Sequence, residues 1–147
     1  MKAGRVDGFG RVYDAKGKPL LYQEEYIVQQ NRGFVSSDAP DAPLSLMEGD
    51  MYLTNWRLLV LGPVKQEFVT DEVSTEGYHS ARFRPDLSKP ACDYLELYLD
   101  EVRDAKRSFM GDLKLFVPRG CVDVSGTSKE FKGELLKAVE WYLRSRR

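Results

Sequence analysis

The chain has 147 residues, with 22 lysines and arginines against 23 aspartates and glutamates and a single histidine. This length suits one domain with its own hydrophobic core. The near-neutral balance lacks the global charge of a nucleic-acid-binding protein, and a single histidine excludes multi-histidine metal sites and mechanisms that need two imidazoles. We therefore expect no nucleic-acid partner, no metal and no cofactor.

Targeting signals are not apparent in the sequence. No apolar run approaches the roughly 20 residues that cross a bilayer, and the glycine-rich, charged residues 1–12 lack the apolar centre of a secretory signal. These patterns predict a cytoplasmic protein without a transmembrane segment. Cys92 and Cys121 belong to no C-x-x-C pair and are expected to be free, buried thiols.

The first elements are predicted strands. Residues 26–35 are predicted to form a strand with a break at Gly33. Residues 36–46 contain two prolines and are predicted to form an exposed loop. Glu48 and Gly49 open the clearest hairpin, where the glycine is expected to supply unusual backbone angles at the strand entry. Asn55 supplies its turn, and the apolar run 58–61 predicts a strand that is covered on both faces.

The pattern weakens between residues 64 and 91, where Gly77, Pro85 and Pro90 interrupt it. Nearly thirty residues is long for a connection between strands. The segment therefore either contains short strands near 67–69 and 81–84 or forms a functional loop.

Regular alternation returns at residues 94–99 and 113–117, and residues 122–124 form the returning strand of a second hairpin. The last element is a helix whose apolar residues share one face of a 3.6-residue period. These residues are Phe131, Leu135, Ala138, Val139, Tyr142 and Leu143. Thr127 and Glu130 have the spacing of a capping box at its start. The aromatics Tyr52, Trp56, Trp141 and Tyr142 are expected to pack in the core, with Trp56 the one that could be exposed.

Residues 48–61, EGDMYLTNWRLLVL, resemble the "G-x-lyl-T-n-x-R-l" hairpin of GRAM and related pleckstrin-homology-like domains. The later elements follow in the order that this family has. The resemblance implies an α+β, mostly β fold: a two-sheet barrel of about seven strands capped by a C-terminal amphipathic helix. It implies a single domain over 1–147, with residues 1–23 as an N-terminal extension and 63–92 as a long inter-strand connection.

This family includes phosphoinositide, ubiquitin and peptide binders. The resemblance therefore implies a non-catalytic binding module that engages a protein partner or an anionic membrane surface, where it would be peripheral. His79 is interpreted as a surface residue rather than the base of a cysteine nucleophile, and no catalytic residue is expected. The alternatives are a small enzyme using Asp, Glu or Tyr, and a structural subunit of an assembly. The oligomeric state stays open.

A lipid headgroup site would need several lysines or arginines converging on phosphates. The loop that binds phosphoinositides in the family instead carries acidic residues here: Asp38, Asp41, Glu48 and Asp50. The candidate ligand-binding residues are the cations of the long connection and of the last hairpin turn: Lys65, Arg82, Arg84, Lys89 and Arg119. A second cluster, Arg103, Lys106 and Arg107, is interpreted as a surface neutralised by Asp100, Glu101 and Asp104.

Overall fold

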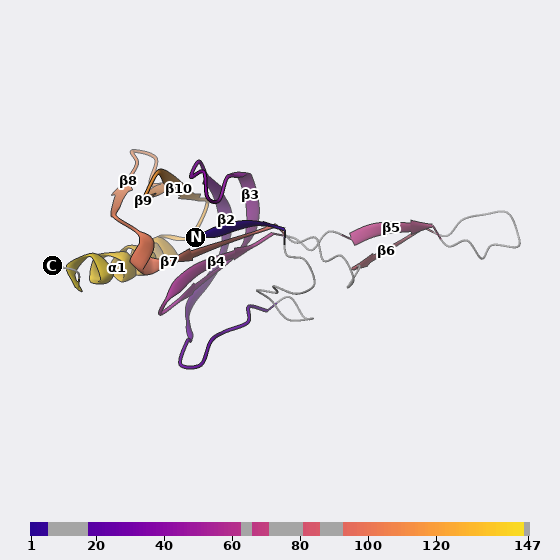
Figure 1. Cartoon of the computed structure of the whole chain (residues 1–147), viewed down its shortest axis with the longest axis horizontal. Helices are drawn as coiled ribbons and strands as arrows, with labels where there is room; N and C mark the ends of the chain where they lie inside the picture. The colour runs from indigo at the N-terminus through magenta and orange to yellow at the C-terminus, as the bar shows by residue number, and fades with distance from the viewer. Residues whose placement is uncertain (6–17, 63–65, 71–80, 86–92, 146–147) are drawn as a thin grey trace, which may run out of the picture.

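The structure is a computed structural model that describes residues 1–5, 18–62, 66–70, 81–85 and 93–145, with side chains for residues 1, 18–62 and 94–145. Eight strands form one antiparallel sheet in the order β1-β7-β4-β3-β2-β10-β9-β8, and one helix follows them (Figure 1). The elements are β1 (Lys2–Arg5), β2 (Ile27–Ser37), β3 (Leu44–Thr54), β4 (Arg57–Leu61), β5 (Gln66–Thr70), β6 (Ala81–Pro85), β7 (Asp93–Tyr98), the 3-10 turn η1 (Leu99–Glu101), β8 (Asp104–Arg107), β9 (Leu113–Val117), β10 (Gly120–Ser125) and α1 (Lys129–Ser145).

Two strands of 11 residues, β2 and β3, let the sheet fold over itself. Strand β2 pairs with β3 along its length, whereas β10 pairs only with its second half, Phe34–Ser37. Two register shifts, at Ile27/Gln29 and Val35/Ser37, interrupt the β2–β3 ladder, and such irregularities bend a strand. Strand β2 therefore belongs both to the half made with β3, β4, β7 and β1 and to the half made with β10, β9 and β8 (Figure 1).

The main core lies between these halves and under α1. Alternate residues of the strands point inward, including Leu58, Leu95 and Leu115, and all are fully buried. The helix contributes Phe131, Leu135 and Val139, which recur every four residues and therefore share one face. The predicted strands at 58–61, 94–99, 113–117 and 122–124 and the predicted C-terminal helix are confirmed.

Two glycines have roles that differ from those predicted. Strand β2 does not break at Gly33, where an added Cβ would lie 2.6 Å from Thr127 Cγ2. Gly49 lies inside β3 rather than at its entry, and an added Cβ would lie 2.5 Å from the Leu61 carbonyl oxygen. Both residues are glycine because neighbouring atoms come too close for a side chain, not because the strand needs unusual angles.

The predicted exposed loop at 36–46 is also corrected. Strand β2 continues to Ser37 and β3 begins at Leu44, so the connection is only 38–43. Ala39 is fully buried within it. An added Cβ on Gly120 would lie 2.6 Å from Ala39 Cα, so this loop packs directly onto the β9–β10 turn.

The weakly patterned segments contribute strands. Strands β5 and β6 pair as a separate two-stranded sheet, so the structure has the first of the two alternatives for this segment, short strands near 67–69 and 81–84. In the predicted N-terminal extension, β1 pairs with β7, with Ala3 opposite Leu95. Cys121 is a free, half-buried thiol, and Cys92 and His79 lie outside the described residues. No helix in the described part of the chain is long and apolar enough to span a membrane.

The helix cap lies one residue later than predicted. The Phe131 N–H donates to Ser128 Oγ at 3.1 Å, whereas Thr127 Oγ1 is buried without a hydrogen-bond partner among the described residues. We expect Ser128→Ala to lower the free energy of unfolding by about 1 kcal/mol. Thr127→Val, which removes the unpaired hydroxyl but keeps the shape, should leave stability unchanged or raise it. Urea unfolding measures both, and a larger loss in Thr127→Val than in Ser128→Ala would contradict this assignment.

Candidate binding surface

Two polar residues of the 48–61 hairpin, Thr54 and Arg57, belong to a buried ion network on the outer face of the sheet. Arg57 is 2% exposed and donates to both oxygens of Glu25, from Nε at 2.8 Å and from Nη2 at 3.0 Å. Its Nη1 donates to Glu96 Oε2 at 2.7 Å, and Nη2 also donates to the Leu20 carbonyl oxygen. Thr54 Oγ1 donates to Glu25 Oε2 at 2.6 Å. Arg57 and Thr54 therefore hold the segment before β2 against the sheet.

Aromatic rings cover this network. The Arg57 guanidinium lies 5.0 Å from the centroid of the Tyr22 ring, and the Tyr22 and Tyr98 hydroxyls are 3.0 Å apart. Burial, together with the Tyr22 hydrogen bond and the nearby Glu96, raises the pKa of Tyr98. Burial also opposes ionisation of Glu25, yet hydrogen bonds from Arg57, Thr54 and the Tyr22 N–H outweigh it and lower the pKa of that carboxyl. The network is a fully paired structural feature rather than an open site.

The predicted ligand-binding cations are only partly described. Lys65 and Lys89 lie outside the described residues. Arg82 and Arg84 lie on β6, opposite Val69 and Glu67 in register, and their side chains are outside the description. Arg119 is exposed in the two-residue turn between β9 and β10, with a φ of 72° that is uncommon for a residue other than glycine.

A hollow of about 290 Å³ lies near this turn, lined by Met1, Asp41, Asp100, Glu101, Arg103, Val117 and Pro118. Three carboxylates outnumber its two cations, the Arg103 guanidinium and the Met1 ammonium, which makes it unsuited to a phosphate. Glu101 also accepts a hydrogen bond from the Met1 amino group. Asp100 and Glu101 belong to η1 and line this hollow with Arg103, one of the three cations that they were predicted to neutralise. The other two, Lys106 and Arg107, lie on β8.

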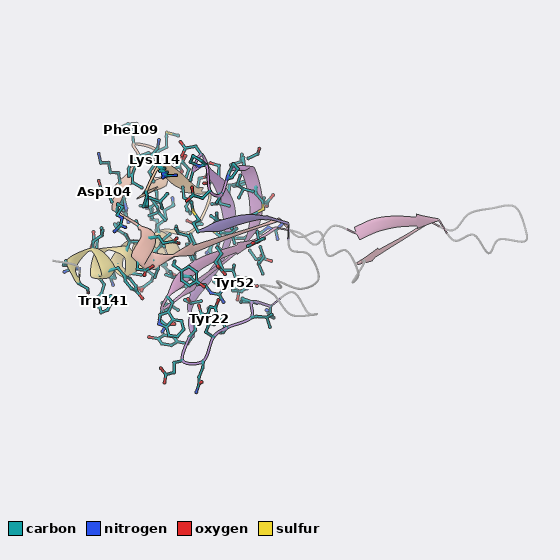
Figure 2. All side chains as sticks on the ribbon, viewed as in Figure 1. Tyr22, Tyr52, Asp104, Phe109, Lys114 and Trp141 are labelled. Carbon is teal, nitrogen blue, oxygen red and sulfur yellow. The ribbon has the colours of Figure 1, made fainter. Side chains whose placement is uncertain are left out.

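The turn between β8 and β9 carries the most exposed apolar side chains that the structure describes. The Ser108 N–H donates to the Asp112 carbonyl oxygen at 2.8 Å, and the Gly111 N–H donates to the Ser108 carbonyl oxygen at 3.0 Å. Gly111 has a φ of 86°, which glycine adopts without strain. Phe109 and Met110, which lie between Ser108 and Gly111, are 103% and 81% exposed. Figure 2 shows Phe109 at the outer end of this hairpin.

Cations surround this turn. Lys106 of β8 and Lys114 of β9 are direct register partners, and both are exposed. Arg107 follows Lys106 and is exposed as well, and Lys132 Nζ lies 3.7 Å from where a Cβ on Gly111 would be. Lys114 is 4.0 Å from Asp123 Oδ1, at the limit of an ion pair. Like charges directly opposite on a sheet destabilise it by a few tenths of a kcal/mol to about 1 kcal/mol.

We call Lys106, Arg107, Lys114 and Lys132 the basic collar and Phe109 with Met110 the apolar tip. Reasoning from the sequence missed the tip, although a signal was present. The central positions of such a turn usually carry Gly, Pro, Asn, Asp or Ser. Two large apolar side chains before a glycine break that rule, and such local exceptions gather at functional sites.

A second exposed apolar surface, the apolar strip, consists of Leu20, Leu21, Tyr22, Tyr26, Ile27 and Val28, which are 40–61% exposed. Trp141 of α1 was predicted to be in the core but is 61% exposed. It cannot turn inward because Phe131, Leu135 and Val139 already occupy the buried face of the helix. The adjacent Tyr142 is partly buried and donates to the Asn55 carbonyl oxygen at 2.8 Å.

Comparison with known proteins identifies the fold. No family model matches the chain, and no curated protein sequence matches it. Solved structures do match: one described as "Vps36 N-terminal PH domain" aligns with a TM-score of 0.56 at 18% identity, over 97% of this chain and 96% of that one. The fold is pleckstrin-homology-like. The predicted fold class is therefore confirmed, and at this identity the likeness concerns the fold alone.

Proposed function

We propose that this pleckstrin-homology-like chain is a non-catalytic binding module that engages an anionic membrane surface with its basic collar. The observation that carries the proposal is the pairing of Lys106 with Lys114. Two exposed lysines opposite each other cost stability. A surface rich in phosphate or carboxylate groups removes that repulsion and gains attraction from both ammonium groups.

The charges around the collar support this choice. Asp104 lies opposite Phe116, two cross-strand pairs away from the lysines, and Lys106 Nζ lies 5.6 Å from the centroid of the Phe116 ring. Asp123 Oδ1 is 4.0 Å from Lys114 Nζ, at the limit of an ion pair. Asp112 is half-buried at the base of the turn. Each lysine or arginine close to an anionic leaflet contributes about 1 kcal/mol to binding, an attraction that falls off within a Debye length.

Removing the paired lysines tests the proposal. We expect Lys106→Ala/Lys114→Ala to weaken binding to phosphatidylserine-containing vesicles by about thirtyfold at low salt. The same variant should be as stable as the parent or slightly more so, because the repulsion is gone. Co-sedimentation measures binding, and urea unfolding measures stability.

Arg32→Ala/Arg144→Ala is the matched control. It removes two exposed cations that lie outside the collar, Arg32 of β2, which pairs with Glu48 at 3.1 Å, and Arg144 near the end of α1, which is 4.0 Å from Glu140. This variant should keep most of the binding. Absence of binding to anionic vesicles at low salt, or equal binding to neutral ones, would refute the proposal.

The cations predicted from the sequence remain proposed ligand-binding residues: Lys65, Arg82, Arg84, Lys89 and Arg119. Arg119 lies at the opposite end of β9 from the β8–β9 turn, so it would contact a ligand separately from the basic collar. Assignment to the GRAM subgroup, which rests on residues 48–61, is likewise a proposal, as is a cytoplasmic location with peripheral attachment to a membrane.

A protein partner is the second candidate, and the apolar strip favours it. Exposed apolar patches of this kind commonly mark interaction surfaces. If the chain fails to bind anionic vesicles at low salt, the strip becomes the leading candidate surface. The fold comparison does not favour the small-enzyme alternative.

A further inference from the structure

The apolar tip is not explained by electrostatic attachment. Phe109 is fully exposed and Met110 is 81% exposed, at the outer end of a hairpin whose turn is closed by three hydrogen bonds. The third of these runs from the Asp112 N–H to Ser108 Oγ at 3.1 Å. A turn held in this way presents both side chains outward rather than letting them fold back onto the sheet.

The shape of the tip indicates what it contacts. The tip projects from the surface with two apolar side chains, whereas a site that binds a helix or strand is usually a groove. A bilayer interface accepts such a projection without a preformed pocket, and aromatic rings favour that region. The basic collar lies directly behind the tip, where lipid headgroups would be if the tip entered the acyl-chain boundary.

We propose that Phe109 and Met110 insert into the acyl-chain boundary of an anionic bilayer, while the basic collar contacts the headgroups. This inference rests on the proposed membrane function and adds an apolar insertion site to it. Burial of each side chain supplies affinity that salt does not screen, in contrast to the attraction of the lysines.

Two measurements test the insertion. The first measures tryptophan fluorescence in a Trp141→Phe background. Adding Phe109→Trp to this background should increase the fraction of fluorescence that lipids with brominated acyl chains quench in phosphatidylserine-containing vesicles, compared with Trp141→Phe alone. Phe109→Ala and Met110→Ala should each weaken vesicle binding about tenfold, and Phe109→Leu should restore most of it. At 0.5 M NaCl the parent should keep measurable binding that Phe109→Ala/Met110→Ala loses.

Leu46→Ala/Trp141→Ala is the matched control, because it removes two exposed apolar side chains elsewhere, 69% and 61% exposed. It should bind like the parent, and all variants should keep the parent's Tm because none of these side chains is buried. Suppose that the parent binds anionic vesicles, that Phe109→Trp adds no quenching, and that the alanine variants of the tip bind as well as the parent. This outcome would overturn insertion but leave the proposed function standing, and the tip would then be a contact for a groove on a protein partner. Absence of all vesicle binding would overturn both.

Discussion

Replacing Arg57 with alanine is expected to lower the free energy of unfolding by about 3–5 kcal/mol. The guanidinium is 2% exposed and pairs with Glu25 and Glu96, whose side chains are 0% and 7% exposed. Alanine leaves both carboxylates buried without their cation, and the Leu20 carbonyl oxygen also loses its donor. Urea unfolding at pH 7 measures the loss. Arg32→Ala, at an exposed ion pair with Glu48, should cost less than about 1 kcal/mol.

The network also predicts the acid response. Because the pKa of Glu25 is lowered in the folded state, its contribution is fully present above the unfolded pKa, about 4.3, and is lost as the pH falls through the folded pKa. As the pH falls below 5, the free energy of unfolding should therefore decrease less in Arg57→Ala than in the parent. Replacing Arg57, Glu25 and Glu96 together with methionine should recover much of the stability that Arg57→Ala loses, because no charge is then left unpaired. A loss below about 1 kcal/mol in Arg57→Ala would mean that the network does not hold the segment before β2.

Gly49→Ala is the second large effect, with an expected loss of about 3 kcal/mol. The added Cβ would lie 2.5 Å from the Leu61 carbonyl oxygen and 2.9 Å from its carbon, and both are backbone atoms that cannot rotate away. Strands β3 and β4 would have to separate where Asp50 pairs with Leu61. Denaturant unfolding with a hydrogen-exchange map of β3 and β4 measures the loss and its position.

Gly133→Ala serves as the control, because an added Cβ there meets no atom within 4 Å. Gly133 lies inside α1, where alanine should raise stability by about 0.5–1 kcal/mol. If both glycine variants changed stability alike, the close approach at Gly49 would not be the cause.

Periodicity in the sequence was sufficient for most of the fold. Leu58–Leu61 was predicted as a strand covered on both faces, and β4 is buried throughout. The cause is visible in the contacts: Leu58 and Val60 enter the main core, whereas Leu59 and Leu61 join Tyr52 in a smaller cluster on the other face. Alternation and helical period report burial directly, so such elements can be read without knowing their partners.

The binding surface could not be read in the same way because it depends on register. Lys106 and Lys114 are neighbours because the length of the β8–β9 turn sets the pairing register of the two strands. A register shift of one residue would place the two side chains on opposite faces of the sheet. The pairing of Arg57 with Glu25 joins residues 32 positions apart. Asp100 and Glu101 belong to η1 and line the acidic hollow with Arg103, whereas Lys106 and Arg107 lie on β8. Proximity in the sequence therefore did not show which cations share a surface with these carboxylates.

The register between β4 and β7 bears on how the chain tolerates changes in length. Leu61 and Tyr94 are direct pairing partners, so the chain leaves the sheet and re-enters it at adjacent positions. The entropy of closing such a loop grows only with the logarithm of its length, about 0.6 kcal/mol for each doubling. Segments of very different length can therefore join these two strands at little thermodynamic cost, which makes this junction a place where evolution or an engineer can add sequence without rebuilding the core.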